Sequence, residues 1–149
     1  MDFGSRTDQR EPPQRLNNLA WKQIKMLLRL LYLGLAGAAG TLARYGLSGL
    51  VGRSVGTTFP WGTAAVNLLG CLFFGLLWAF FEDRLAVSGQ VKMILFVGFF
   101  GAFTTFSTFA FETCQLLDDS QWLWAAGNFL LQMLGLTAVM VGLTVGKWL

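Results

Sequence analysis

Four long apolar stretches with short connections constrain this chain more than any other feature. A bilayer core about 30 Å thick needs roughly 20 apolar residues in each helix that crosses it. The stretches of suitable length are Leu30–Leu50, Trp61–Phe81, Val91–Phe111 and Trp122–Val145. Because the connections are too short to hold a second domain, the sequence predicts an all-α membrane protein with four transmembrane helices.

The segment before the first stretch is polar and basic. Its first eighteen residues, "MDFGSRTDQREPPQRLNN", lack the short apolar core and small-residue cleavage site of a secretory signal. We therefore expect a disordered tail and a first helix that is retained. From Leu19 onward, Lys22, Lys25 and Arg29 recur at helical intervals, either as an interfacial lead-in on anionic headgroups or as a solvated flank. The expected division is residues 1–29 as tail and lead-in and residues 30–149 as the transmembrane domain.

The sequence lacks the residues needed for metal hydrolysis and for Cys/His or Ser/His catalysis. There is no histidine, and the two cysteines, Cys71 and Cys114, stand alone in apolar stretches without metal-ligand spacing. We interpret both as small core residues and expect that the chain is not an enzyme.

Basic residues gather on one side of the predicted spans. An even number of spans places both termini on the same side. That side holds nine basic residues: Arg6, Arg10, Arg15, Lys22, Lys25, Arg29, Arg84, Lys92 and Lys147. The other side has Arg53, with Arg44 inside the first span. The positive-inside rule then predicts cytoplasmic termini.

Polar side chains inside apolar spans are costly unless they find partners. Arg44 either reaches out to the membrane surface or makes a structural hydrogen bond. Asn67 in the second span, and Asn128 and Gln132 on one face of the fourth, either bond neighbouring helices or contact a ligand. Glycines recur in the first and fourth spans, which favours close helix packing.

The third span contains "GFFGAFTTFSTFAFET", in which four hydroxyls lie among phenylalanines. A helix could unwind at Gly98, Gly101 or Thr104–Thr105, and carbonyls freed by such a break commonly hold a cation. Phe103, Phe106 and Phe109 recur every three residues. They could face lipid or the core, or meet an anion with their positive ring edges.

Three segments together resemble the CrcB/Fluc family of fluoride channels. They are "GAAGTLARY", "WGTAAVNLLGCLFFG" and "GFFGAFTTFSTFAFET", and the similarity extends over about Leu30 to Val145. The resemblance implies an antiparallel, dual-topology-type dimer of four-helix subunits, with a broken third helix, two fluoride pores and a structural Na⁺ at the centre.

The same resemblance assigns roles by motif position. Asn67 would donate to fluoride, while Phe106 and Phe109 would present their ring edges to it. Other residues would line the path, hold Na⁺ through their carbonyl groups, or lie near the pore: Ser107, Thr108, Asn128 and Gln132 on the path; Gly101 and Thr104 at Na⁺; Arg44 and Glu112 near the pore. Asn128 and Gln132 stand where family members often carry Tyr and Ser.

The resemblance predicts passive export of fluoride across the inner (plasma) membrane. Expected partners are fluoride, lipids and a second, oppositely oriented subunit, and no nucleic acid. The basic bias favours one fixed orientation, which would require an oppositely oriented paralogue as the second subunit. The alternative is a second copy of this chain. Two alternatives are a small multidrug exporter, although the first span lacks the carboxylate which that class uses, and a non-conducting assembly subunit.

Overall fold

The computed structural model describes residues 12–56, 58–83 and 87–149, and every element in these ranges is a helix. The elements are α1 (Pro12–Val55), α2 (Trp61–Asp83), α3 (Gly89–Lys92), η1 (Met93–Phe100), α4 (Gly101–Phe103), α5 (Phe106–Asp118) and α6 (Trp122–Trp148). Four segments are long and apolar enough to cross a membrane: 14–55, 61–82, 89–118 and 122–148. The prediction of four membrane-spanning helices is confirmed.

Helix α1 is much longer than the span predicted for it. Its 44 residues begin at Pro12, so the expectation of a disordered tail is wrong for residues 12–18, while residues 1–11 lie outside the described part. A proline at the first position suits a helix, because its missing N–H would have no partner there. The helix ends before Gly56, whose φ of 103° favours glycine and whose N–H donates to the carbonyl of Gly52.

The third membrane-length segment is composed of four helical pieces. Helices α3, η1 and α4 follow one another without interruption, and η1 is a π-helix of eight residues. The backbone is then extended at Thr104 (ψ 157°) and Thr105 (φ −149°) before α5 begins. Of the positions considered for unwinding, Gly98 and Gly101 remain helical.

Glycines bring α2 and α6 into direct backbone contact. A Cβ atom built on Gly142 would meet the carbonyl oxygen of Leu72, and one on Gly146 would meet that of Leu76. In the opposite direction, a Cβ atom on Gly75 would meet the carbonyl oxygen of Val139. Close approach of this kind is the usual basis of helix association in lipid, so the predicted close packing of the fourth span is confirmed.

Helix α1 packs in the same way against the third segment, but over a shorter length than its glycines suggested. Gly40 lies against the backbone of Phe99 and Phe103, and Gly37 is 3.8 Å from the carbonyl oxygen of Gly98, measured from an ideal Cβ position. Gly34 has open space around it. The buried core between these elements is mainly aromatic and includes Val66, Phe96, Phe100 and Phe103.

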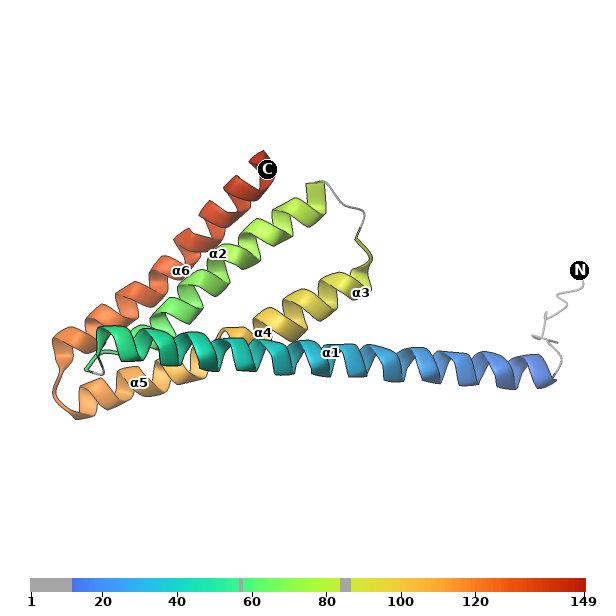
Figure 1. Ribbon diagram of the computed structural model, residues 1–149, viewed down its shortest axis with the longest axis horizontal. Coiled ribbons are helices and arrows are strands. Elements are labelled where there is room, and N and C mark those ends of the chain that lie inside the picture. The colour runs from blue at the N-terminus through green and yellow to red at the C-terminus, as the bar shows by residue number, and fades with distance from the viewer. Residues whose placement is uncertain (1–11, 57, 84–86) are drawn as a thin grey trace, which may run out of the picture.

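The helix ends fall into two groups, as an even number of spans requires (Figure 1). The end of α2, the start of α3 and the end of α6 lie toward one end of the bundle, and α1 extends far beyond that end. The connections from α1 to α2 and from α5 to α6 lie at the other end. Lys92 joins α2 and α3 at the first end, where its Nζ is 2.6 Å from Oε2 of Glu82.

Candidate functional site

The side chain of Asn67 holds the extended segment between α4 and α5. Its Oδ1 accepts a hydrogen bond from the backbone N–H of Thr105 (2.8 Å), and its Nδ2 donates to the carbonyl oxygen of the same residue (3.0 Å). The second Nδ2 hydrogen is donated to Oε1 of Gln132 on α6 (3.0 Å). A single buried amide therefore satisfies backbone groups that lipid could not satisfy.

This network fixes the orientation of both amides. Because a backbone N–H can only donate, the atom of Asn67 that faces it must be the oxygen. Nδ2 of Asn67 must then face Gln132, so Gln132 accepts with Oε1 and turns its Nε2 away. That Nε2 is buried and has no hydrogen-bond partner among the described residues. It is an available donor, whereas both Nδ2 hydrogens of Asn67 are engaged.

A cavity of about 220 Å³ opens beside this amide pair. Its lining includes Asn67 and Gln132 together with the rings of Phe106 and Phe109, whose centroids are 5.5 Å apart in an edge-to-face arrangement. Phe109 is 5% exposed and Phe106 is 76% exposed in the single chain. Four of the seven residues predicted to line the ion path therefore surround one cavity. Its remaining lining residues are Cys71, Thr104, Thr105 and Met133.

The hydroxyls of the third segment converge on Thr105. Its Oγ1 accepts the backbone N–H of Thr108 (3.2 Å) as the N-cap of α5. It is also 2.8 Å from Oγ1 of Thr108 and 3.4 Å from Oγ of Ser107. The predicted polar residues Ser107 and Thr108 thus form one hydroxyl cluster, which is placed by the start of α5.

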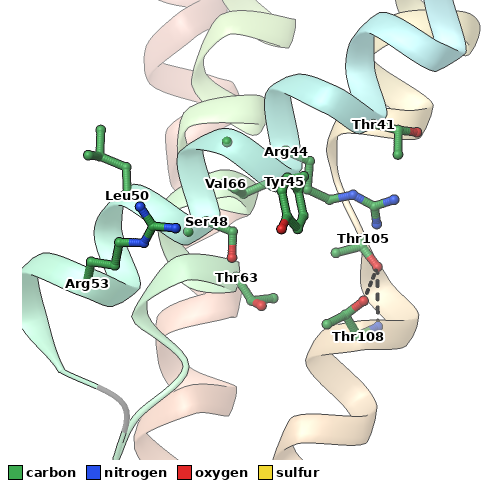
Figure 2. A pocket seen from close by; sticks show the side chains of 12 residues that line it. Thr41, Arg44, Tyr45, Ser48, Leu50, Arg53, Thr63, Val66, Thr105 and Thr108 are labelled. Carbon is green, nitrogen blue, oxygen red and sulfur yellow. Dashed lines mark hydrogen bonds between the residues drawn. The ribbon is translucent and has the colours of Figure 1, made fainter.

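A larger cavity of about 620 Å³ lies on the other side of Thr105, between α1, α2 and α5. Figure 2 shows the side chains of Arg44 and Arg53 on α1, with the guanidinium of Arg44 on the side toward Thr41 and Thr105. Thr63 and Thr108 add hydroxyls to the same lining. The half-buried Arg44 therefore faces an open cavity whose lining includes several hydroxyls.

Glu112 lies in the middle of α5, and Asn128 lies one helical turn before Gln132 on α6. Oε1 of Glu112 accepts a hydrogen bond from Oγ1 of Thr63 (2.7 Å), and Nδ2 of Asn128 donates to Oγ1 of Thr113 (2.9 Å). Asn128 is fully buried, and its Oδ1, like Oε2 of Glu112, has no partner within the described part of the chain. Neither residue belongs to the lining of the two cavities.

The carbonyl groups of Gly101 and Thr104 leave the regular helix ladder at the extended segment. The N–H four residues after Gly101 is that of Thr105, which donates to Asn67 instead. The N–H four residues after Thr104 is that of Thr108, which donates to the capping hydroxyl of Thr105. Both carbonyl oxygens are hard ligands of the kind that alkali cations accept.

Three residues that organise the site had no site role predicted from the sequence, although Thr105 was considered as a point where the helix could unwind. Thr105 is the hydroxyl centre and the backbone partner of Asn67, Thr63 binds Glu112, and Thr113 binds Asn128. A threonine directly before a helical run is a sequence signal for an N-cap, so Thr105 could have been found. Thr63 and Thr113 act through contacts between helices, and no local pattern indicates them.

Fold and site together define a small multi-pass membrane protein in which amides, hydroxyls and aromatic rings of the membrane-length helices line two open cavities. Residues 31–143 match the family described as "CrcB-like protein, Camphor Resistance (CrcB)". The chain belongs to this family, which confirms the resemblance.

Similar curated proteins have one name in common. The "Fluoride-specific ion channel FluC" of Nitrosococcus oceani is 53% identical over 123 residues, which are 82% of this chain and 98% of that protein. The protein of the same name from Solidesulfovibrio magneticus is 50% identical over 123 residues, again 82% and 98% of the two chains. That of Desulforapulum autotrophicum is 48% identical over 120 residues, 80% and 96%. These relatives are named as ion channels, which confirms that the chain is not an enzyme.

Replacing Thr105 by valine removes the hydroxyl that caps α5 and keeps a similar shape. We expect the Thr105→Val variant to lose about 1 kcal/mol of stability, the usual contribution of an N-cap, and the amides of Ser107 and Thr108 to exchange faster. Thermal unfolding in detergent and hydrogen exchange measure the two effects. Thr105→Ser is the control, since it retains the cap; equal behaviour of both variants would contradict the capping role.

Proposed function

We propose that this chain forms a fluoride channel that lets F⁻ leave the cytoplasm passively. The observation that supports this most directly is the cavity lined by Gln132 and by the rings of Phe106 and Phe109, beside which Gln132 has a buried Nε2 without a hydrogen-bond partner among the described residues. The name shared by the relatives supports fluoride as the ion.

The chemistry of the narrow cavity suits a small anion that must shed its water. Fluoride loses a strong hydration shell when it enters protein, so a selective path has to supply many donors in its place. Amide N–H groups and the positive edges of phenyl rings are such donors. The lining of this cavity contains no lysine or arginine, so the ion is not held by a fixed charge and can leave again.

The two amides have different parts in this proposal. Gln132 offers the free N–H, while Asn67 aligns it and holds the extended segment. Asn67 itself can donate to the ion only by giving up its bond to Gln132 or its bond to the carbonyl of Thr105. Ser107 and Thr108 would continue the polar path from the first turn of α5, and Asn128 would do so from one helical turn before Gln132 on α6. Arg44 would act near the pore from the neighbouring cavity and Glu112 from the middle of α5.

We propose a second subunit because Phe106 is largely exposed in one chain although it lines the cavity. The second subunit inserts with the opposite orientation and covers this ring, so that the two chains complete the path together. If this chain inserts in both orientations, the second subunit is another copy of it. If the chain inserts in only one orientation, the second subunit is a paralogue.

A structural Na⁺ is part of the same proposal. The carbonyl oxygens of Gly101 and Thr104 lack their usual helical donors, and the equivalent carbonyls of the second subunit would complete the set. The ion would tie the two extended segments together at the centre of the dimer. It would supply charge there and would not be transported.

Export follows from electrostatics if the membrane is the inner (plasma) membrane. Each elementary charge gains about 2.3 kcal/mol per 100 mV of membrane potential, so a negative cytoplasm drives F⁻ outward without ATP or a coupled proton. The excess of Lys and Arg at one end of the bundle supports cytoplasmic termini.

Fluoride efflux from liposomes tests the function and the role of Phe106 together. We expect liposomes with the purified protein to release fluoride but not chloride, and Phe106→Leu to lower the rate at least about tenfold because it removes the ring edge. Phe111→Leu is the matched control, since Phe111 is another exposed phenylalanine of α5, 65% exposed, outside the cavity lining. If the chain inserts in both orientations, an absence of efflux from the unaltered protein would favour the assembly-subunit alternative. Equal rates in the two variants would contradict the pore assignment.

The cation proposal predicts that Na⁺ stabilises the dimer. Ligand binding to the folded state raises the unfolding temperature with ligand concentration, so we expect the transition to rise in NaCl and to remain constant in N-methylglucamine chloride at equal ionic strength. Thr104→Ala should retain the effect, because the ligand is a backbone carbonyl. A transition that does not respond to Na⁺ would rule the site out.

Labelling of tagged termini in intact cells tests the orientation. If the basic bias fixes the topology, both tags stay protected from an impermeant reagent in nearly all chains, and efflux requires an oppositely oriented paralogue. If about half of the chains react at both termini, the chain inserts in both orientations and forms a homodimer.

A further inference from the structure

The first half of helix α1 projects away from the rest of the molecule (Figure 1). Every residue from Gln14 to Arg29 is exposed, and the match to the family begins only at residue 31. At a rise of 1.5 Å per residue, the 44 residues of α1 are roughly 66 Å long, about twice the thickness of a bilayer core. About half of this helix must therefore lie outside the hydrocarbon.

The charges of this half are confined to one face. Arg15, Lys22, Lys25 and Arg29 follow one another at intervals of seven, three and four residues, which is the spacing of one side of an α-helix. There is no acidic residue anywhere in α1 that could neutralise them.

The opposite face is apolar. Leu16, Ala20, Ile24, Leu27 and Leu31 are spaced by four, four, three and four residues. Three of them, Leu16, Ile24 and Leu27, are 68%, 46% and 61% exposed. Trp21, also exposed, lies on the border between the two faces. A helix with one basic and one apolar face, and with a tryptophan, has the composition of a segment that lies in a membrane interface.

We propose that residues 14–29 bind the anionic headgroups of the leaflet from which α1 emerges. The segment continues directly into a membrane-spanning helix, so it is always within reach of that surface. Its four cations match the negative charge of acidic lipids, and each strengthens binding by about fivefold near such a surface. Its apolar face is transferred from water to the boundary between headgroups and acyl chains, which is favourable for apolar surface. This inference does not depend on which ion the protein conducts.

The proposal requires the helix to turn where it leaves the membrane. Gly34 is the first glycine of α1, and a Cβ built on it would have nothing within 4 Å. Glycine weakens a helix interior. In the structure α1 is one continuous helix here, and its packing against the third segment begins at Leu33, whose carbonyl oxygen is 3.2 Å from an ideal Cβ position on Gly98. We place the turn between Leu30 and Gly34, where this packing begins.

Hydrogen exchange on the full-length protein in nanodiscs tests the proposal. Discs of phosphatidylcholine alone are compared with discs that also contain phosphatidylglycerol. We expect the amides of residues 16–29 to exchange at least roughly tenfold more slowly in the anionic discs, with no change in α2 or α6. The triple variant Lys22→Gln, Lys25→Gln, Arg29→Gln should lose this difference, and the charge-conserving variant Lys22→Arg, Lys25→Arg should retain it.

Two outcomes would overturn the proposal. The first is equal exchange in neutral and anionic discs, which would show that the headgroup charge is not recognised. The second is protection that rises with the number of proteins per disc, which would show that another copy covers the apolar face. The variants lie outside the packed bundle, so their folding can be verified from unchanged exchange in α2 and α6.

Discussion

The site depends on the pairing of the Asn67 side chain with the backbone of Thr105. In a membrane, two consecutive residues outside a helix leave polar groups that no solvent satisfies, at a cost of several kcal/mol for each group. Asn67 supplies one acceptor and one donor to the same residue, at 2.8 and 3.0 Å. Without it, the backbone N–H of Thr105 would lose the only partner that it has among the described residues.

The further bond from Asn67 to Gln132 depends on the close approach of α2 and α6. Gly75, Gly142 and Gly146 let the two backbones touch, which sets Asn67 on one helix opposite Gln132 on the other. The third amide hydrogen bond then fixes that Oε1 of Gln132 faces Asn67, and that Nε2 remains without a partner among the described residues. Small residues at the contact between two helices thus influence the orientation of an amide that lines the cavity.

The sequence was sufficient for the parts of the structure that rest on composition and local pattern. Four apolar stretches predicted four helices, and the repeated glycines of the fourth span predicted its close packing. Sequence could not predict that helix α1 begins at Pro12, because polar residues next to a Pro-Pro pair are equally common in irregular segments. It grouped Asn67, Phe106, Phe109 and Gln132 only through family resemblance, since their meeting depends on how three helices cross. The pairing of Glu112 with Thr63 has the same origin, because the two residues are 49 positions apart.

The contacts between α2 and α6 also determine where this subunit is mechanically stiff. A hydrogen bond between the side-chain amides of Asn67 and Gln132 links the two helices. Direct backbone contact links them again near Gly142 and Gly146. Sliding one helix along the other would break both attachments at once. The two therefore behave as one rigid unit, and α5 is fastened to it by the hydrogen bonds of Thr63 to Glu112 and of Asn128 to Thr113. The helix that bears both phenyl rings is thereby held against a stiff pair of helices, so the width of the space beside the rings depends on that pair.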